Sequence, residues 1–343
     1  MRVLLVANPD PTHVGRHLIH AANELGIDAT LLDVNRAFQA PRLFRSVCWH
    51  LLGHRPPHLQ RFNQELLSAC SRLSPDLVIS TGLAPISRST LETLRLRNIT
   101  SANFLTDDPW NPSHRAPWFM RALSAYDYVF SPRRANIPDL TSLKGPSVHY
   151  LPFAFSPDVH HPVSSPSPQS GKVVFIGGAD QDRVQLMSLI QKAGLPLDLW
   201  GGYWNRHPSL APLANGHATA EDFPSIVTNA AVNLCLVRRA NRDGHSMRTF
   251  ELAAMGGCMA VEDTPEHRDL FGPDDHLVRY FSSDSSLIPV LQHLLQNPSD
   301  RQRLATAVRA QFFDQSGHRY SDRLQSMIEI AKPSAVCHNH SLT

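Results

Sequence analysis

The side chains best suited to chemistry in this chain are a basic and an acidic residue in its C-terminal third. Arg248 and Glu251 lie three positions apart, so they share one face of a helix predicted over residues 247–255. Ser246 precedes that helix and has the residue type of an N-cap. A guanidinium and a carboxylate at the start of a helix suit a ligand with both phosphate and hydroxyl groups. An ion pair on the surface of an ordinary helix is the alternative interpretation.

Two predicted strands position this helix. The apolar run 230–237 predicts a buried strand before it, and residues 258–261 predict another after Gly256 and Gly257 end it. The polar loop 238–245 connects the first strand to the helix. A loop leading from the carboxyl end of a parallel strand to a helix N-terminus is a common anion site.

A second pair of glycines follows another predicted strand. Residues 172–176 are apolar after Lys172, and Gly177 and Gly178 come directly after them. Glycine there lets backbone amides approach a diphosphate closely. Arg183 lies in the first turn of a helix predicted over residues 180–192. A cation in that turn opposes the helix dipole, which a bound phosphate would explain, although a solvated arginine is the alternative.

The N-terminal half has its own candidates. Asp107 and Asp108 follow a strand predicted over residues 100–105, and Pro109 forces an extended backbone there. Open α/β sheets place active groups at such strand ends. An Asx-type turn is the alternative. His13, in the loop after the first strand, is a further candidate that an ordinary solvated histidine would also explain.

One segment resembles a known family. The residues R-T-F-E-L-A-A-M-G-G-C-M-A-V-E-D, 248–263, are similar to the donor-site helix of GT-B glycosyltransferases. They more closely resemble the CgeB-like, spore-maturation-type branch of the family 4-like enzymes. The resemblance extends to residues 173–178, 221–233 and 318–323. It implies an α/β GT-B fold, in which two doubly wound, Rossmann-like domains face a cleft and a C-terminal helix crosses back to the N-terminal domain.

The domain boundaries follow from this resemblance and from composition. We predict an acceptor-binding Rossmann-like domain over residues 1–155 and a linker, rich in Pro, Ser and His, over 156–171. A nucleotide-sugar-binding domain is predicted over 172–312, and a crossover helix over 313–330. Residues 331–343 are expected to be a disordered tail.

The resemblance also implies roles for individual residues. Glu251 matches the second of two family glutamates and would hold the nucleotide ribose. The first of them falls on Asp243, a shorter carboxylate that would face the sugar together with His245. Groups that would neutralise the departing diphosphate are Gly177, Gly178, Arg183, Arg248 and the helix start at Ser246. Asp108 is the candidate base if the enzyme inverts, with Asp107 and His13 beside it in the cleft. A retaining enzyme needs no such base, and the sequence leaves both mechanisms open.

The predicted function is therefore glycosyl transfer. A hexosyltransferase-type enzyme would move a sugar from a nucleotide-diphosphate-sugar, expected to be a UDP-sugar, to an acceptor hydroxyl without a metal or cofactor. The acceptor could be a glycan, a protein or a small molecule. A non-catalytic nucleotide-sugar-binding protein and a GT-B sugar-nucleotide epimerase are the alternatives.

Composition limits the other possibilities. The net charge of +2 over 343 residues gives no case for nucleic acid as a partner. The 19 histidines are scattered, with His160 and His161 adjacent, and no spacing predicts a metal site. The five cysteines are odd in number and far apart, which fits a reducing compartment. Residues 1–8 do not resemble a signal peptide and no apolar run could span a membrane, so we expect a soluble, cytoplasmic protein.

One helix leaves peripheral membrane association open. Residues 38–53 are basic and apolar, a pattern that can lie on a membrane surface. The favoured interpretation is instead a helix that packs on the sheet through Leu43, Val47 and Leu51.

Overall fold

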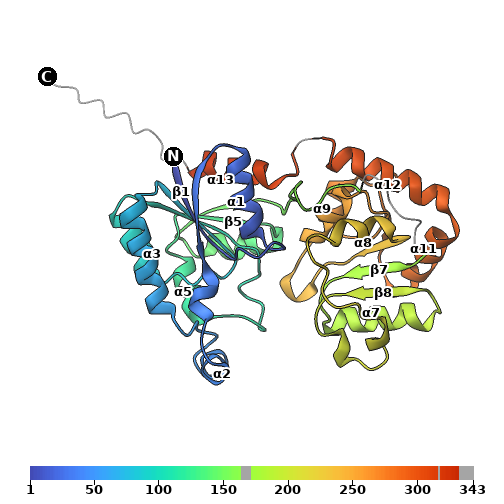
Figure 1. Cartoon of the computed structure of the whole chain (residues 1–343), viewed down its shortest axis with the longest axis horizontal. Coiled ribbons are helices and arrows are strands. Elements are labelled where there is room, and N and C mark those ends of the chain that lie inside the picture. Colours follow the sequence, from blue (N-terminus) through green and yellow to red (C-terminus); the bar gives the residue numbers. More distant parts are fainter. Residues whose placement is uncertain (164–170, 316, 332–343) are drawn as a thin grey trace. The chain divides into compact units, whose positions relative to one another are not determined.

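The computed structural model describes residues 1–163, 171–315 and 317–331. Within these residues the chain forms two compact units, shown in Figure 1. The first contains residues 1–152, 240–242 and the helix that begins at Tyr320, and the second contains residues 153–239 and 243–319. No helix of the described residues combines the length and the apolar composition that crossing a membrane requires.

The first unit is built on a six-stranded parallel sheet with the order β2-β1-β3-β4-β5-β6. Its inner strands are largely buried on both faces, as in parallel sheets covered by helices; in β1, for example, every residue from Val3 to Ala7 is buried. The strands are β1 (Arg2–Ala7), β2 (Asp28–Asp33), β3 (Leu77–Thr81), β4 (Thr100–Phe104), β5 (Tyr128–Ser131) and β6 (Ser147–Tyr150).

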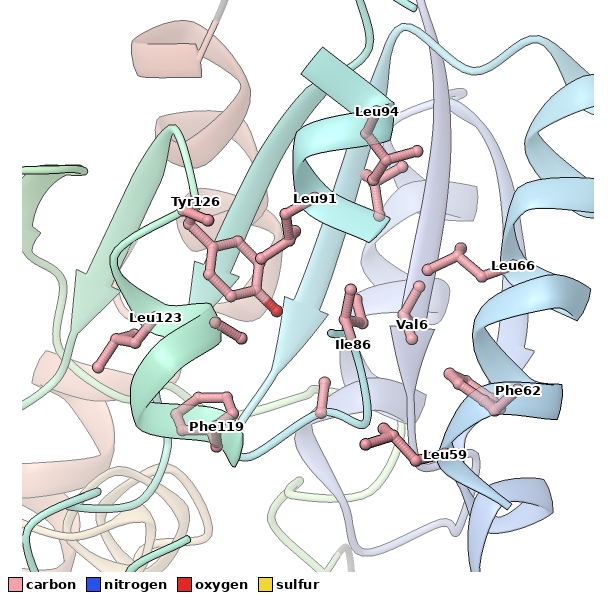
Figure 2. Packing of buried hydrophobic residues seen from close by; sticks show 14 of the residues in the cluster. Val6, Leu59, Phe62, Leu66, Ile86, Leu91, Leu94, Phe119, Leu123 and Tyr126 are labelled. Atoms are coloured by element: carbon pink, nitrogen blue, oxygen red, sulfur yellow. The ribbon is translucent and has the colours of Figure 1, made fainter. Parts of the chain in front are cut away.

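Helices cover both faces of this sheet (Figure 1). They are α1 (Val14–Glu24), α2 (Arg42–Leu51), α3 (Leu59–Leu73), α4 (Arg88–Leu96), α5 (Pro117–Leu123), α6 (Ile137–Ser142) and α13 (Tyr320–Ala331), with 3-10 turns at Val34–Phe38 and Arg134–Asn136. Figure 2 shows the core on one face, where Phe62 of α3, Leu91 of α4 and Phe119 of α5 pack together. On the other side α1 lies along α13, and the rings of His17 and Tyr320 stack 5.2 Å apart.

The segment before α3 differs from its prediction. The expected helix over residues 38–53 is a 3-10 turn that ends at Phe38 and a separate helix, α2, because Pro41 is extended between them. The prediction that this helix packs through Leu43, Val47 and Leu51 is wrong, because all three side chains are exposed. Residues of α3 already fill the core beside the sheet, and α2 contributes only Cys48 to the interior.

The second unit is built on a five-stranded parallel sheet with the order β11-β10-β9-β7-β8. Its strands are β7 (Val173–Ile176), β8 (Leu197–Trp200), β9 (Val232–Cys235), β10 (Met259–Glu262) and β11 (Arg279–Phe281). Its helices are α7 (Gln181–Lys192), α8 (Phe223–Asn229), α9 (Met247–Ala254), α10 (Pro265–Phe271), α11 (Asp284–Gln296) and α12 (Pro298–Phe312), with 3-10 turns at Trp204–Arg206, Ala211–Leu213 and Arg239–Asn241. Two parallel sheets with alternating helices confirm the predicted α/β class.

The residues before β7 pack into the second unit. Phe153, Phe155, Val159 and His160 are all buried, and the Phe155 amide donates to the carbonyl of His318 at 3.0 Å. The first part of the predicted linker is therefore packed chain. The remainder of that linker, residues 164–170, and the predicted tail from residue 332 onwards lie outside the described residues.

Candidate functional site

The candidate site lies at the point where the strand order of the second sheet reverses. β7 and β9 are neighbours, with Phe175 opposite Leu234, and the chain proceeds outward from them in opposite directions. Open parallel sheets bind ligands beyond the carboxyl ends of their strands at such a point. Gly177 and Gly178 follow β7 there, and the polar loop that leads into α9 follows β9.

Arg248 and Glu251 form an ion pair on α9, as their spacing predicts. The Nη1 group of Arg248 donates to Oε2 of Glu251, while its Nε group donates to the carbonyl of Ile176, the last residue of β7, at 3.1 Å. Glu251 is only 1% exposed, whereas one third of the Arg248 side chain, 33%, faces solvent. The arginine therefore joins a buried carboxylate to the end of a strand and still presents charge to a ligand.

His160 lies against the other oxygen of Glu251. Its Nε2 atom is 3.5 Å from Oε1 of Glu251, and its Nδ1 atom accepts the amide N–H of Ser156 at 3.0 Å. Because Nδ1 accepts, the ring proton of the neutral imidazole lies on Nε2 and points at the carboxylate. Burial, together with the positive charge of Arg248, lowers the pKa of His160 to about 3, so the ring is neutral at pH 7.

An aromatic ring completes this arrangement. Phe223 opens α8, and the guanidinium of Arg248 lies 4.6 Å from the centre of its ring. The ring of His160 meets Phe223 edge-on at 5.6 Å. A cation over an aromatic face is an attractive contact that restricts the orientation of the arginine. The four side chains thus form one connected cluster within the second unit.

Two further arginines lie at the start of α7. Asp180 caps this helix, accepting the amide of Arg183 at 3.0 Å. The guanidiniums of Arg183 and Arg238 share its carboxylate, at 3.4 and 3.8 Å. Burial lowers the pKa of Arg183, and the nearby charges of Arg238 and Arg248 lower it further while Asp180 and Asp243 oppose them. Positive groups therefore converge on this turn. Arg183 lies in the first turn of its helix, and Arg238 was not among the predicted residues.

The glycine turn is closed by the loop after β8. Gly201 has a φ of +127°, and a Cβ atom on it would lie 2.4 Å from the carbonyl oxygen of Gly177. The indole of Trp204 donates to that same oxygen at 2.8 Å, and Arg183 donates to the carbonyl of Gly178 at 3.0 Å. The amide N–H of Gly178 donates to no group in the described part of the chain, so it is available to an anion.

The loop before α9 folds back on the second unit. The Asp243 carboxylate accepts the amide of Arg238 at 3.3 Å, and Ser246, the residue before α9, donates its amide to Thr249 Oγ1 at 3.1 Å. His245 is fully buried: its Nδ1 lies 2.5 Å from Glu266, and its Nε2 accepts the amide of Phe153 at 3.3 Å. Asp243 and His245 thereby fix the shape of the loop that leads to α9.

The first unit holds the other predicted residues. Asp108 is 1% exposed and accepts hydrogen bonds from Arg242, from the amide of Trp110 and from Asn136. This favours a structural role over the predicted role of general base, because the carboxylate is already fully engaged. Asp107 is half-buried and forms no hydrogen bond within the described residues. His13 is exposed at the start of α1. Within the described residues, no hydrogen bond joins His13 to Asp107 or Asp108.

Sequence reasoning missed three contributors to these clusters. His160 lies in a Pro- and Ser-rich stretch without periodicity, so nothing local marked its burial. Arg238 directly follows a predicted buried strand, and residues at the carboxyl end of a parallel strand are expected to bind ligands, so its position could have identified it. Arg242 pairs with Asp108 from 134 positions away, a distance at which a single sequence shows no pairing.

A protein-family model matches part of the chain, mainly within the second unit. Residues 183–329 match a family model described as glycosyl transferase-like. The matched segment includes Arg183, Arg238, Arg248 and Glu251, and it ends within α13. No curated protein sequence gives a significant match to the chain.

Solved structures share the architecture of the chain. Sucrose-phosphate synthase from Thermosynechococcus elongatus aligns with a TM-score of 0.69 at 12% identity, over 96% of this chain and 98% of its own. TarM aligns with a TM-score of 0.57 at 10% identity, over 79% of this chain and 58% of its own. A protein from Listeria monocytogenes, provisionally assigned as a UDP-N-acetylglucosamine 2-epimerase, aligns with a TM-score of 0.55 at 11% identity, over 96% of this chain and 95% of its own. These likenesses confirm the predicted two-domain α/β fold, and with the family match they support a GT-B glycosyltransferase.

Proposed function

We propose that the protein is a glycosyltransferase of hexosyl type that transfers a sugar from a UDP-sugar to an acceptor hydroxyl, and that it belongs to the CgeB-like branch. The observation that carries this proposal is the buried carboxylate of Glu251. This carboxylate lies within the glycosyl transferase-like segment, on helix α9, which starts near the point where the strand order of the second sheet reverses. Arg248 and His160 hold it in place.

Glu251 would bind the ribose of the donor. Each carboxylate oxygen has two acceptor positions, of which Arg248 takes one on Oε2 and His160 faces Oε1. The remaining positions can accept the paired hydroxyls of a ribose. The ion pair and the buried imidazole hold the carboxylate in one orientation, and hydroxyls that donate to a carboxylate form charge-assisted hydrogen bonds.

The diphosphate would lie at the glycine turn. The unengaged amide of Gly178, the start of α9 at Ser246, and the guanidiniums of Arg183 and Arg248 can all approach it. Arg238, with 41% of its side chain exposed, adds a further cation. These groups would stabilise the negative charge that develops on the leaving diphosphate, while the loop carrying Asp243, fixed in place through His245, would lie beside the sugar.

We propose that the first unit takes the acceptor, a glycan, a protein or a small molecule. Asp107 and His13 follow strands of its parallel sheet, at the carboxyl edge where such sheets place active groups. If the enzyme inverts, Asp107 is the better candidate base, because Asp108 is bound by Arg242. A retaining enzyme would need neither carboxylate.

The activity test is product analysis with a panel of UDP-sugars, with and without candidate acceptors. Release of UDP together with a new glycoside supports transfer. Conversion of the donor sugar to its epimer without an acceptor would instead make the protein an epimerase, and binding without turnover would make it a binding module. We expect EDTA to leave the activity unchanged, since arginines and amides serve the diphosphate; loss of turnover that Mg²⁺ or Mn²⁺ restores would contradict this.

We also propose a cytoplasmic location, which cell fractionation tests. Four cysteines in the described residues, Cys48, Cys70, Cys235 and Cys258, are free and buried, as expected in a reducing compartment. Burial raises the pKa of Cys70 to about 11 and that of Cys235 to about 12, so these thiols stay protonated.

A further inference from the structure

The helix α2 presents large apolar side chains to solvent. Leu43 is 83% exposed and Leu51 is 77% exposed, and Val47 between them is also exposed. The three residues are spaced four apart, so they form one stripe along a helix of 10 residues. Burying such groups is favourable, and a contiguous apolar stripe on a surface marks an interaction site. The packing of the first unit leaves this stripe uncovered, because α2 buries only Cys48.

The chain around α2 is strongly basic. Residues 34–64 contain five arginines and no aspartate or glutamate, although the net charge of the whole chain is only +2. Arg42, Arg45 and Arg55 form no ion pair within the described residues, unlike Arg61, which pairs with Glu65. The positive charge beside the apolar stripe is therefore not neutralised internally, and it is complementary to an anionic surface.

The arginines gather on the side of α2 away from the apolar stripe. Arg42, Arg45, Trp49 and His50 line a cavity of about 400 Å³, which Arg55 borders from the following loop. Trp49 is 41% exposed and its ring stacks on that of His54 at 4.2 Å. Tryptophan favours the boundary between apolar and aqueous phases. Apolar residues on one side of a helix and arginines on the other are typical of a helix lying in a membrane interface.

We propose that α2 binds the surface of an anionic lipid membrane. Leu43, Val47 and Leu51 would enter the boundary of the acyl chains, and Arg42, Arg45 and Arg55 would contact lipid phosphates. The absence of acidic residues over such a length favours a lipid surface over a second copy of this chain, whose α2 would carry the same positive charge. This inference goes beyond the proposed glycosyl transfer and does not depend on it, because the binding is measured without turnover.

The test is co-sedimentation of the full chain with vesicles. Vesicles of phosphatidylcholine mixed with phosphatidylglycerol should bind the protein at least about tenfold more strongly than vesicles of phosphatidylcholine alone. Each arginine near an anionic surface raises the binding constant by about fivefold. Raising the salt concentration should weaken the binding. Equal binding to both kinds of vesicle, or no binding to the anionic vesicles at low salt, would overturn the proposal.

Matched variants locate the surface. The double substitution Leu43→Ser with Leu51→Ser should weaken vesicle binding by about tenfold or more, whereas Leu96→Ser, on α4 and 85% exposed, should leave it unchanged. Arg42→Glu should weaken it more than Arg72→Glu, an exposed arginine on α3. If the α2 variants bind like the wild type, the proposal fails. These side chains are exposed, so the substitutions should not impair folding, and thermal unfolding verifies this.

Two further outcomes bear on the assignment. Light scattering without lipid measures the oligomeric state. If it shows a dimer that Leu43→Ser abolishes, the stripe is an interface between two copies of the chain and the lipid proposal is overturned. Glu251→Gln should bind vesicles like the wild type, which separates a failure of membrane binding from a failure of the proposed donor site.

Discussion

Asp108 and Arg242 form a bidentate ion pair, although they are 134 positions apart in the chain. Oδ2 of Asp108 accepts Nε–H of Arg242 at 2.6 Å and Oδ1 accepts Nη2–H at 3.1 Å. These hydrogen bonds raise the pKa of Arg242 above its ordinary value. Ala240–Arg242, within the loop from β9 to α9, belong to the first unit through such contacts, so the pair fixes a segment of the loop that precedes the candidate donor-site helix.

We expect Asp108→Asn to lower the free energy of unfolding by about 1–3 kcal/mol, because a buried charge-assisted pair is lost. Urea unfolding measures the change. Arg242→Gln should give a similar loss, and the two changes should not add in the double variant. Asp139→Asn is the control, because it removes the other ion-pair partner of Arg242. The side chain of Asp139 is 42% exposed, so this substitution should lower the free energy of unfolding by less than about 1 kcal/mol. Fully additive effects would contradict the pairing.

Local patterns predicted the elements around α9 in the second unit well. The strand–loop–helix–strand unit around α9 follows from apolar runs ended by glycines, and the Arg248–Glu251 contact follows from helical spacing. Both signals lie within a few residues of the groups they describe. They required no knowledge of the packing of distant segments.

Long-range packing accounts for what was missed. The pairing of Asp108 with Arg242 and the burial of His160 depend on segments that no local pattern connects. The amphipathic pattern of α2 showed which of its faces is apolar, but not that α3 already fills the core, so the burial of Leu43 was predicted wrongly. The helix α5, of 7 residues, was too short to give a periodic signal.

A second prediction concerns the proton acceptor of an inverting mechanism. Asp107→Asn should lower kcat by about 10²–10⁴-fold, the usual contribution of a general base, with unchanged nucleotide affinity. Asp108→Asn serves as the comparison, since its effect should be mainly on stability. A near-normal kcat for Asp107→Asn would remove Asp107 from this role, and near-normal values for both variants would favour a retaining mechanism.

The third prediction concerns the pH dependence of stability. Burial lowers the pKa of His160 to about 3 and that of His267 to about 4. Both stay neutral in the folded state while the unfolded chain, with a histidine pKa near 6.5, binds protons. The unfolded state thus binds more protons, so stability falls as the pH decreases below about 6.5 and is fully present above it.

Urea unfolding at several pH values tests this. Between about pH 6 and pH 5 each buried histidine should contribute a slope of about 1 kcal/mol per pH unit, and for His160 the slope should persist to about pH 4 because the folded pKa of its imidazole is lower. His160→Gln should therefore flatten the dependence by about that amount, even if it lowers stability at every pH. His276→Gln, which removes an exposed histidine, is the control. An unchanged slope in His160→Gln would show that His160 does not remain neutral in the folded protein.

The last prediction tests the donor site through Glu251. Glu251→Gln preserves the shape of the side chain, but it replaces one acceptor oxygen with a donor and removes the charge that Arg248 neutralises. If Glu251 binds the ribose hydroxyls, UDP affinity measured by calorimetry should fall by roughly 1–3 kcal/mol, or about 5–150-fold. Glu221→Gln, an exposed glutamate just before α8, should leave the affinity unchanged. Wild-type affinity in a folded Glu251→Gln protein would leave the Arg248–Glu251 pair as a structural feature of α9 and require the nucleotide to bind elsewhere.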